Sequence, residues 1–112
     1  MTESFIYDAV RTPRGKGRKD GALHEVTSLR LSALTLNALR ERSGLDGHAV
    51  EDVIWGNVTQ VGEQGGCLAR SAVLASDLDE RIPGVAINRF CASGLEAVNM
   101  AANQVSGGGG DA

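Results

Sequence analysis

Residues 84–95 decide the fold, and their sequence is Gly84-Val85-Ala86-Ile87-Asn88-Arg89-Phe90-Cys91-Ala92-Ser93-Gly94-Leu95. After this short apolar run, apolar residues recur at helical spacing: Leu95, Val98, Ala102 and Val105. The pattern predicts a strand that leads through a sharp turn into a helix whose first turn carries Cys91. Helix N-termini stabilise negative charge, because their dipoles align and their first N–H groups are unpaired. A thiol held there ionises more readily, which indicates a nucleophile.

The rest of the chain alternates between strand and helix patterns. The expected elements are a strand at 5–10, a helix at 28–43, a strand within 50–58, a helix at 68–75, a strand at 85–88 and the helix after Cys91. Thr27 or Ser28 is expected to cap the first helix, and Gly44 to stop it. This alternation predicts an α/β fold with a mainly parallel sheet and right-handed crossovers. Sites in such sheets form beyond the carboxyl ends of the strands, where Cys91 lies.

The C-terminal stretch contains four consecutive glycines, at 107–110. We expect a loop at 106–110 that leads to a further strand, because three strands alone leave a sheet edge unpaired. A phosphate-binding glycine loop is a weaker interpretation, since no Lys-Ser/Thr pair follows and the glycines come after a helix.

Composition indicates one small soluble domain. The chain has 112 residues, of which 42% are hydrophobic and 22% charged. No apolar run approaches the roughly 20 residues that span a bilayer, and the N-terminus does not resemble a signal peptide. Two cysteines, Cys67 and Cys91, make neither a metal motif nor a disulfide framework. The cytoplasm is therefore the expected compartment, and a net charge of −3 argues against a general nucleic-acid binder.

Basic residues are concentrated near the N-terminus. One short segment, made a loop by Pro13 and several glycines, holds Arg11, Arg14, Lys16, Arg18 and Lys19. It is either a solvated surface loop or a contact for a phosphate-bearing ligand or an acidic partner. Nucleic acid is the weakest alternative, because no aromatic residues interleave with the charges to stack on bases.

The residues around Cys91 are small, which leaves room for an acyl group beside the sulfur. Amides in the first helical turn would stabilise an oxyanion, as in a nucleophile elbow with Cys in place of Ser. The alternative is a buried, inert cysteine. Cys67 is expected to be a structural helix residue, and His24 and His48 to be surface residues.

Three segments resemble the thiolase family. Asn88-Arg89-Phe90-Cys91-Ala92-Ser93-Gly94-Leu95-Glu96-Ala97 is similar to the thiolase nucleophile motif, and Phe5-Ile6-Tyr7-Asp8-Ala9-Val10-Arg11-Thr12-Pro13 to the opening strand. The segment from Gly62 to Arg70 also resembles the family, and residues 16–21 favour the degradative 3-ketoacyl-CoA type. The resemblance implies that residues 1–112 are an N-terminal half-domain, an incomplete first half of a two-half fold without its final strands.

The resemblance also implies a reaction. Cys91 would attack the 3-keto carbon of a 3-ketoacyl-CoA, acetyl-CoA would depart, and CoA would take the acyl group from sulfur; the reverse is a Claisen condensation. CoA is a co-substrate, and no permanently bound cofactor or metal is expected. The catalytic His and the second, acid/base Cys of the family have no counterpart in this sequence, so we expect residues 1–112 alone to be inactive. A homodimer or dimer of dimers, with a β-oxidation partner subunit, is the expected assembly.

Weaker expectations concern the residues before Cys91. Asn88 is expected to satisfy backbone groups at the strand end, and the resemblance places Asn88 and Arg89 near a dimer interface. Two other classes of function remain open: a non-catalytic dimerisation or assembly module, and a redox sensor that uses an exposed, reactive Cys91.

Overall fold

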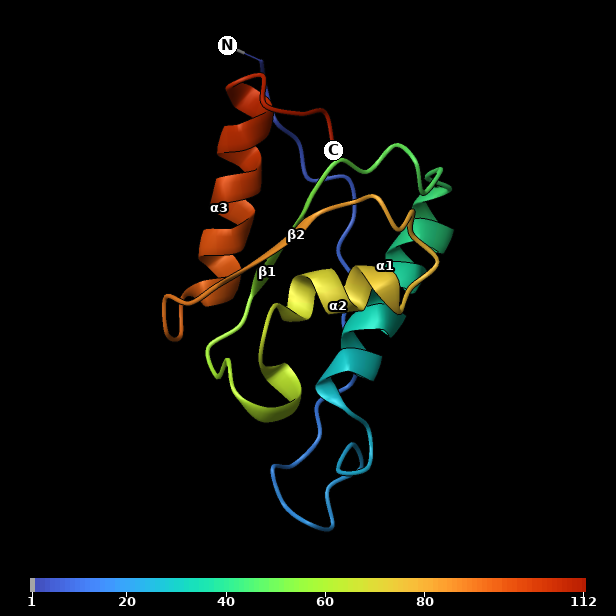
Figure 1. Cartoon of the computed structure of the whole chain (residues 1–112), viewed down its shortest axis with the longest axis vertical. Helices are drawn as coiled ribbons and strands as arrows, with labels where there is room; N and C mark the ends of the chain where they lie inside the picture. Colours follow the sequence, from blue (N-terminus) through green and yellow to red (C-terminus); the bar gives the residue numbers. More distant parts are fainter. Residues whose placement is uncertain (1) are drawn as a thin grey trace.

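A computed structural model describes residues 2–112 (Figure 1). Its elements are α1 (Ser28–Ser43), β1 (Val53–Gly56), the 3-10 helix η1 (Gly62–Gln64), α2 (Leu68–Leu74), β2 (Gly84–Ile87) and α3 (Ser93–Ser106). Within this part of the chain, β1 and β2 form a two-stranded parallel sheet, with Val53 opposite Gly84. The predicted α/β class with parallel strands is confirmed.

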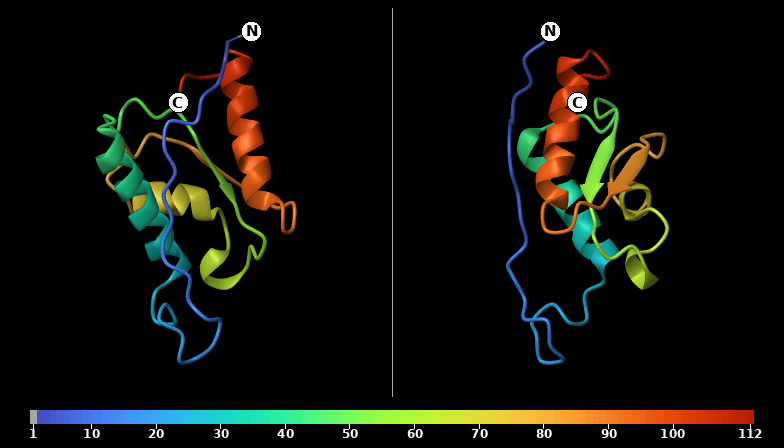
Figure 2. Two further views of the ribbon diagram at one scale, coloured as in Figure 1. Left: turned by 180° about the vertical axis from the view of Figure 1, so that it is seen from behind. Right: turned by 90° about the vertical axis from the view of Figure 1, so that its left-hand side faces the viewer.

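The predicted first strand, at residues 5–10, is not formed. This segment runs extended along the outside of the molecule (Figure 2), and no strand within residues 2–112 pairs with it. Phe5, Ile6 and Tyr7 are 66%, 78% and 89% exposed. The segment is held by an Asp8–Arg42 ion pair of 3.0 Å instead. The segment is rich in β-forming residues, but such residues favour a strand mainly because they pack against side chains of neighbouring strands. This segment has no neighbouring strand among residues 2–112.

The ends of α1 confirm the predicted caps. The Thr27 side chain accepts a hydrogen bond of 3.0 Å from the amide of Arg30, which satisfies one of the unpaired donors of the first turn. Gly44 ends the helix with a φ of 65°, a left-handed conformation that glycine adopts without a steric penalty. Arg40 and Arg42 lie in the last turn, where positive charge is favourable.

Helices cover both faces of the small sheet. Val53 and Trp55 face the core, where Ala69, Ala72 and Val73 of α2 are fully buried. Ile54 and Gly56 point to the opposite face, because side chains alternate along a strand, and α3 packs there. α1 packs on α2. Within residues 2–112, every helix is too short or too polar to cross a lipid bilayer.

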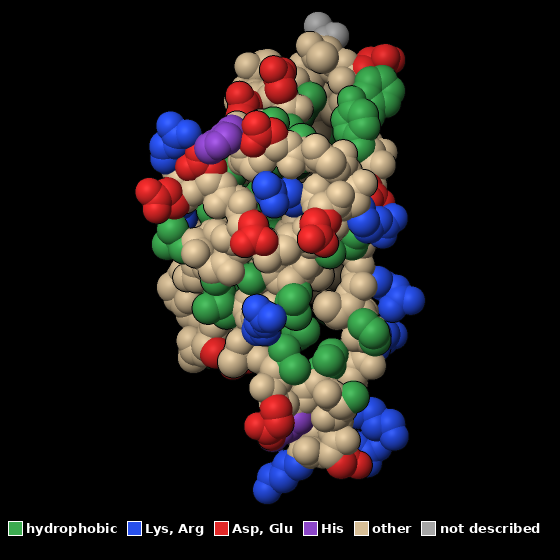
Figure 3. Space-filling model, turned by 90° about the vertical axis from the view of Figure 1, so that its right-hand side faces the viewer, with side chains coloured by type: hydrophobic (Ala, Val, Ile, Leu, Met, Phe, Trp, Pro, Cys, Tyr) green, Lys and Arg blue, Asp and Glu red, His purple; other side chains and the backbone are tan. Residues whose placement is uncertain are grey.

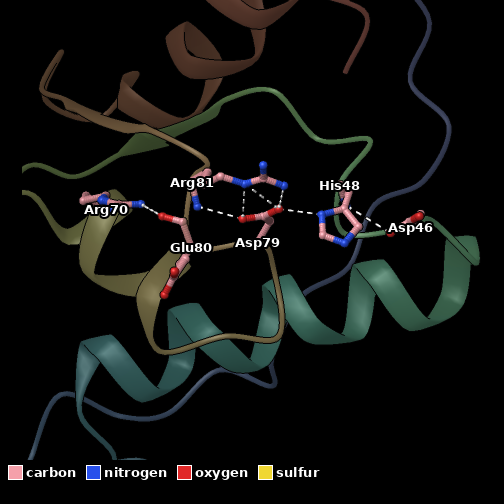
Figure 4. Close-up of polar contacts among 6 residues, drawn as sticks. All are labelled: Asp46, His48, Arg70, Asp79, Glu80 and Arg81. Atoms are coloured by element: carbon pink, nitrogen blue, oxygen red, sulfur yellow. Dashed lines mark hydrogen bonds and ion pairs between the residues drawn. The ribbon is translucent and has the colours of Figure 1, made fainter.

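A polar cluster joins the turn after α1 to the loop before β2 (Figure 4). The Asp79 carboxylate accepts hydrogen bonds from the Arg81 amide (2.9 Å) and guanidinium (2.6 Å) and contacts His48 Nδ1 at 2.5 Å. Arg70 donates to the carbonyl oxygen of Glu80 at 2.6 Å. Hydrogen bonds from the Arg81 side chain and amide, and then from His48, hold the pKa of Asp79 well below its ordinary value of 3.8.

The lowered pKa of Asp79 predicts a loss of stability in acid. A carboxyl group whose pKa is lower in the folded state contributes its full stabilisation above its ordinary value of 3.8, and this contribution is lost progressively as the pH falls from that value toward the lower folded-state pKa. Asp79→Asn should therefore reduce stability at neutral pH, and its difference from the wild type should shrink steadily as the pH falls below 3.8. Urea unfolding across this range measures the effect. Asp77→Asn, in the same exposed loop, is the control. If the free energies of unfolding of the two variants depended on pH in the same way, the lowered pKa of Asp79 would be contradicted.

Candidate active site around Cys91

The turn between β2 and α3 carries Cys91, and we name residues 88–92 the cysteine turn. β2 ends at Ile87 and α3 begins at Ser93. The amide of Asn57, just after β1, donates to the carbonyl oxygen of Ile87 at 2.9 Å and so ties the carboxyl ends of the two strands together. The cysteine turn therefore starts from a fixed point at the edge of the sheet.

Two polar side chains hold the cysteine turn in shape. Asn88 Oδ1 accepts a hydrogen bond of 2.8 Å from the amide of Phe90, as expected for a residue that satisfies backbone groups at a strand end. Ser93, only 4% exposed, accepts from the amide of Arg89 at 2.8 Å and donates to the carbonyl oxygen of Phe90 at 2.6 Å. The turn is thus closed by hydrogen bonds on both sides of Phe90.

Phe90 adopts an unusual backbone conformation. Its φ is 46°, in the left-handed region, where bulky side chains are rare and strained. Such strain persists only where surrounding contacts impose it, and the hydrogen bonds of Asn88 and Ser93 are those contacts. Sequence patterns did not predict this role of Ser93. The residue type alone could have indicated it, because a serine side chain near the start of a helix commonly forms hydrogen bonds with neighbouring backbone groups.

The Cys91 side chain is exposed at the outer end of this turn. The predicted helix after Cys91 is confirmed, but Cys91 does not lie in its first turn: Ala92 is the N-cap, and Cys91 precedes it. The positive φ of Phe90 prevents the helix from starting earlier. The amides of Gly94 and Leu95 have no hydrogen-bond partner among residues 2–112, so two donors remain available at the start of α3.

The other residues singled out from the sequence lie away from Cys91. Cys67 is the N-cap residue of α2, packs against the core and donates its thiol to the carbonyl oxygen of Gly84 at 3.3 Å. His24 and His48 are exposed and contact Glu25 and Asp79. Arg89 forms an ion pair of 3.3 Å with Glu96 of α3. Within residues 2–112, no group of three or more His, Cys, Asp or Glu side chains is arranged to hold a metal ion.

A mainly apolar groove of about 520 Å³ begins beside the cysteine turn. It lies between β1, α3 and Val10, and Gly94 and Gly56 form the part of its wall nearest Cys91. Its other lining residues are Asp52, Ile54, Trp55, Ala97, Val98, Ala101, Gln104, Val105, Gly110 and Ala112. An exposed thiol, free amides and an apolar groove therefore lie next to one another.

Comparison with known proteins assigns the chain to a family. The model of the thiolase N-terminal domain matches residues 4–112. The chain belongs to the thiolase family. This thiolase chain is 42% identical, over 112 residues, to the 3-oxoadipyl-CoA/3-oxo-5,6-dehydrosuberyl-CoA thiolase of Escherichia coli K12. It is 44% identical, over 107 residues, to a beta-ketoadipyl-CoA thiolase of Pseudomonas aeruginosa, and 38% identical, over 112 residues, to a 3-ketoacyl-CoA thiolase of Pseudoalteromonas atlantica.

These alignments cover different shares of the proteins compared. The alignment with the Escherichia coli relative includes 99% of this thiolase chain and 27% of the relative. The corresponding shares are 95% and 26% for the Pseudomonas aeruginosa relative, and 99% and 29% for the Pseudoalteromonas atlantica relative. The chain therefore spans about a quarter of the length of the thiolases that it matches. Within that quarter it contains the cysteine turn, so the resemblance that the sequence suggested is confirmed at the level of the family.

Ser93→Ala tests whether the cysteine turn positions Cys91. We expect Cys91 to acylate about 10-fold or more slowly, because the amide of Arg89 loses its acceptor and the turn can relax. The rate of acetyl transfer from acetyl-CoA to Cys91, followed by mass spectrometry, measures this effect. Ser93→Thr, which keeps the hydroxyl, should restore most of the rate. Ser71→Ala on the exposed face of α2 is the matched control, and equal rates for Ser93→Ala and this control would refute the role.

Proposed function

We propose that Cys91 is the acyl-accepting nucleophile of a thiolase that cleaves 3-ketoacyl-CoA with CoA. The Cys91 thiolate adds to the 3-keto carbon, and the bond between the second and third acyl carbons breaks. Its electron pair leaves with acetyl-CoA as an enolate, which then takes up a proton. The thiolate of CoA next attacks the acyl-Cys91 thioester, releases the shortened acyl-CoA and regenerates the cysteine. The reverse sequence is a Claisen condensation.

One observation carries this proposal: Cys91 is exposed at the outer end of a turn that hydrogen bonds hold rigid. Preorganised donors that face a developing oxyanion are a large source of rate enhancement, and the amides of Gly94 and Leu95 are available for that role. Covalent catalysis divides one difficult carbon–carbon cleavage into two easier steps. The relatives named 3-ketoacyl-CoA thiolase favour this substrate class.

The proposal assigns the proton transfers to groups outside residues 1–112. His24 and His48, the two histidines, are engaged with Glu25 and Asp79. The thiolase resemblance places a catalytic His and an acid/base Cys in a second half of the fold. We therefore infer that residues 1–112 act as an N-terminal half-domain and do not turn over substrate by themselves.

The cellular setting follows from the same proposal. The degradative direction would place the enzyme in β-oxidation in the cytoplasm, as a homodimer or dimer of dimers, with CoA as a co-substrate and no permanently bound cofactor. The relatives named for 3-ketoacyl-CoA and beta-ketoadipyl-CoA support this substrate class.

An acylation experiment tests the proposed function. The full-length protein is incubated with acetyl-CoA or acetoacetyl-CoA, and the Cys91 peptide is examined for an acyl mass adduct. An adduct that added CoA removes supports the thiolase mechanism. Modification of Cys91 by peroxide alone would favour a redox sensor. Absence of both modifications would favour an assembly module.

A further inference from the structure

The hydrogen bonds that hold the cysteine turn do not use the side chain of Phe90. The amide of Phe90 donates to Asn88 Oδ1 at 2.8 Å. Its carbonyl oxygen accepts from the hydroxyl of Ser93 at 2.6 Å and from the amide of Ser93 at 3.1 Å. Every residue type except proline can form these three bonds, because they involve only backbone atoms of position 90. The turn therefore needs the backbone of residue 90 and not a phenyl ring.

Phenylalanine is an unfavourable residue for the conformation at position 90. With a φ of 46°, the residue lies in the left-handed region, which glycine adopts freely and asparagine adopts more readily than a bulky residue does. Among residues 2–112, no other residue except glycine has a positive φ. The ring is also 75% exposed, so burial within this part of the chain does not offset the strain. Strain that the fold does not require indicates a function for the side chain.

Phe90 is the immediate neighbour of the candidate nucleophile, and both residues are exposed. Consecutive Cα atoms are about 3.8 Å apart across a trans peptide bond, so an acyl group on the Cys91 sulfur begins within side-chain reach of the phenyl ring. A Cβ atom added at Gly94 would meet nothing within 4 Å, which shows that the space beside the start of α3 is open. An acyl group on Cys91 therefore has room to extend and an apolar ring within reach.

The surroundings of Cys91 contain little charge. Among residues 84–100 the charged side chains are Arg89 and Glu96, and they form an ion pair of 3.3 Å with each other. The groove that begins at Gly94 is mainly apolar. The cysteine turn lies at the left of Figure 1, whereas Figure 3 views the molecule from the right and shows charged side chains of both signs. Residues 84–100 therefore offer no unpaired cation to a negatively charged acyl group.

We propose that Phe90 is a specificity-determining residue, whose ring packs against the acyl group on Cys91 and favours an apolar chain over one that ends in a carboxylate; this inference rests on the proposed function. Contact with an apolar chain removes both the chain and the exposed ring from water. A carboxylate held beside the ring loses part of its hydration, and no free cation compensates for that loss. The proposal distinguishes between substrates for which relatives are named, since a 3-oxoadipyl group ends in a carboxylate.

The test uses two acyl-CoA donors with the same four-carbon chain: butyryl-CoA, which ends in a methyl group, and succinyl-CoA, which ends in a carboxylate. In each case the Cys91 thiolate attacks the thioester carbonyl carbon and forms a new C–S bond. The bond to the CoA sulfur breaks, and CoA leaves as a thiolate that takes up a proton. Mass spectrometry of the Cys91 peptide from the full-length protein measures both rates. Their ratio cancels changes in the position of Cys91, because both donors react with the same thiolate.

We expect the wild type to accept butyryl faster than succinyl, and Phe90→Asn to lower the butyryl-to-succinyl ratio about 10-fold. Phe90→Leu, which keeps an apolar side chain, should retain most of the wild-type ratio. Leu74→Asn replaces an exposed apolar residue at the end of α2 and is the matched control, with the wild-type ratio expected. Phe90→Asn should also unfold at the same or a higher urea concentration than the wild type, because asparagine adopts the left-handed region more readily.

The role of Phe90 would be overturned by a wild type that accepts both groups equally fast, or by an unchanged ratio in Phe90→Asn. It would also be overturned by an equal change in Leu74→Asn, or by a lower urea midpoint for Phe90→Asn, which would mean that the ring packs within the fold. Failure of the proposed function gives a different result, because wild-type Cys91 would then form no acyl adduct with either donor. Adducts with an unchanged ratio would keep the thiolase mechanism and remove only the role of Phe90.

Discussion

Cys91→Ser is expected to eliminate the acyl adduct and to lower thiolytic turnover of the full-length protein on the order of 10³-fold or more. A serine hydroxyl is a weak nucleophile at neutral pH unless a base takes its proton, and His24 and His48 are engaged elsewhere. The fold should be unaffected, because the Cys91 side chain is exposed. Mass spectrometry of the Cys91 peptide and a thiolysis assay with acetoacetyl-CoA measure the two effects.

Cys67→Ser is the matched control for this variant. The Cys67 thiol donates to the carbonyl oxygen of Gly84 at 3.3 Å, and a hydroxyl can make the same hydrogen bond. We expect acylation of Cys91 to continue in this variant. A Cys91→Ser protein that still turns over, or a Cys67→Ser protein that loses its adduct while remaining folded, would show that the nucleophile has been misidentified.

Gly56→Ala is expected to give the largest loss of stability. Gly56 is the last residue of β1, and a Cβ atom there would lie 2.5 Å from the backbone carbon of Ser93 and 2.6 Å from the amide nitrogen of Gly94. These are backbone atoms, so α3 itself must move away from the sheet. Overpacking of this kind costs about 1–3 kcal/mol, a large part of the stability of a small domain. Urea unfolding measures the loss.

The same substitution should slow acylation of Cys91, because the cysteine turn shares Ser93 with α3. Gly17→Ala is the control for stability: a Cβ atom there meets nothing within 4 Å, so the free energy of unfolding should stay nearly constant. If Gly56→Ala unfolded at the same urea concentration as the wild type, the close approach of α3 to β1 would be wrong.

The sequence predicted those elements whose signals are local. The Thr27 cap, the Gly44 stop and the strand–turn–helix order around Cys91 all depend on residues a few positions apart. The periodicity of α3 likewise follows from its own sequence. Family membership was also predictable, since the segment around Cys91 is distinctive and the thiolase match extends over residues 4–112.

The features that the sequence did not predict depend on distant contacts or on backbone geometry. Residues 5–10 have strand composition but no adjacent strand, which composition does not reveal. The left-handed φ of Phe90 and the two hydrogen bonds of Ser93 lie within five residues, but they depend on the backbone geometry of the turn, which periodicity does not encode. The ties from Ser28 to Glu63 and from His48 to Asp79 join residues more than 30 positions apart, and neither has a sequence signal.

The register of the sheet has a consequence for how the chain folds. Val53 pairs with Gly84, 31 positions later, so the two strands meet only after the whole crossover through α2 has closed. Closing such a segment costs entropy before any ladder bond forms, which makes parallel pairing slow compared with helix formation. We therefore expect helical structure, above all in the 16-residue α1, to form before the two strands pair.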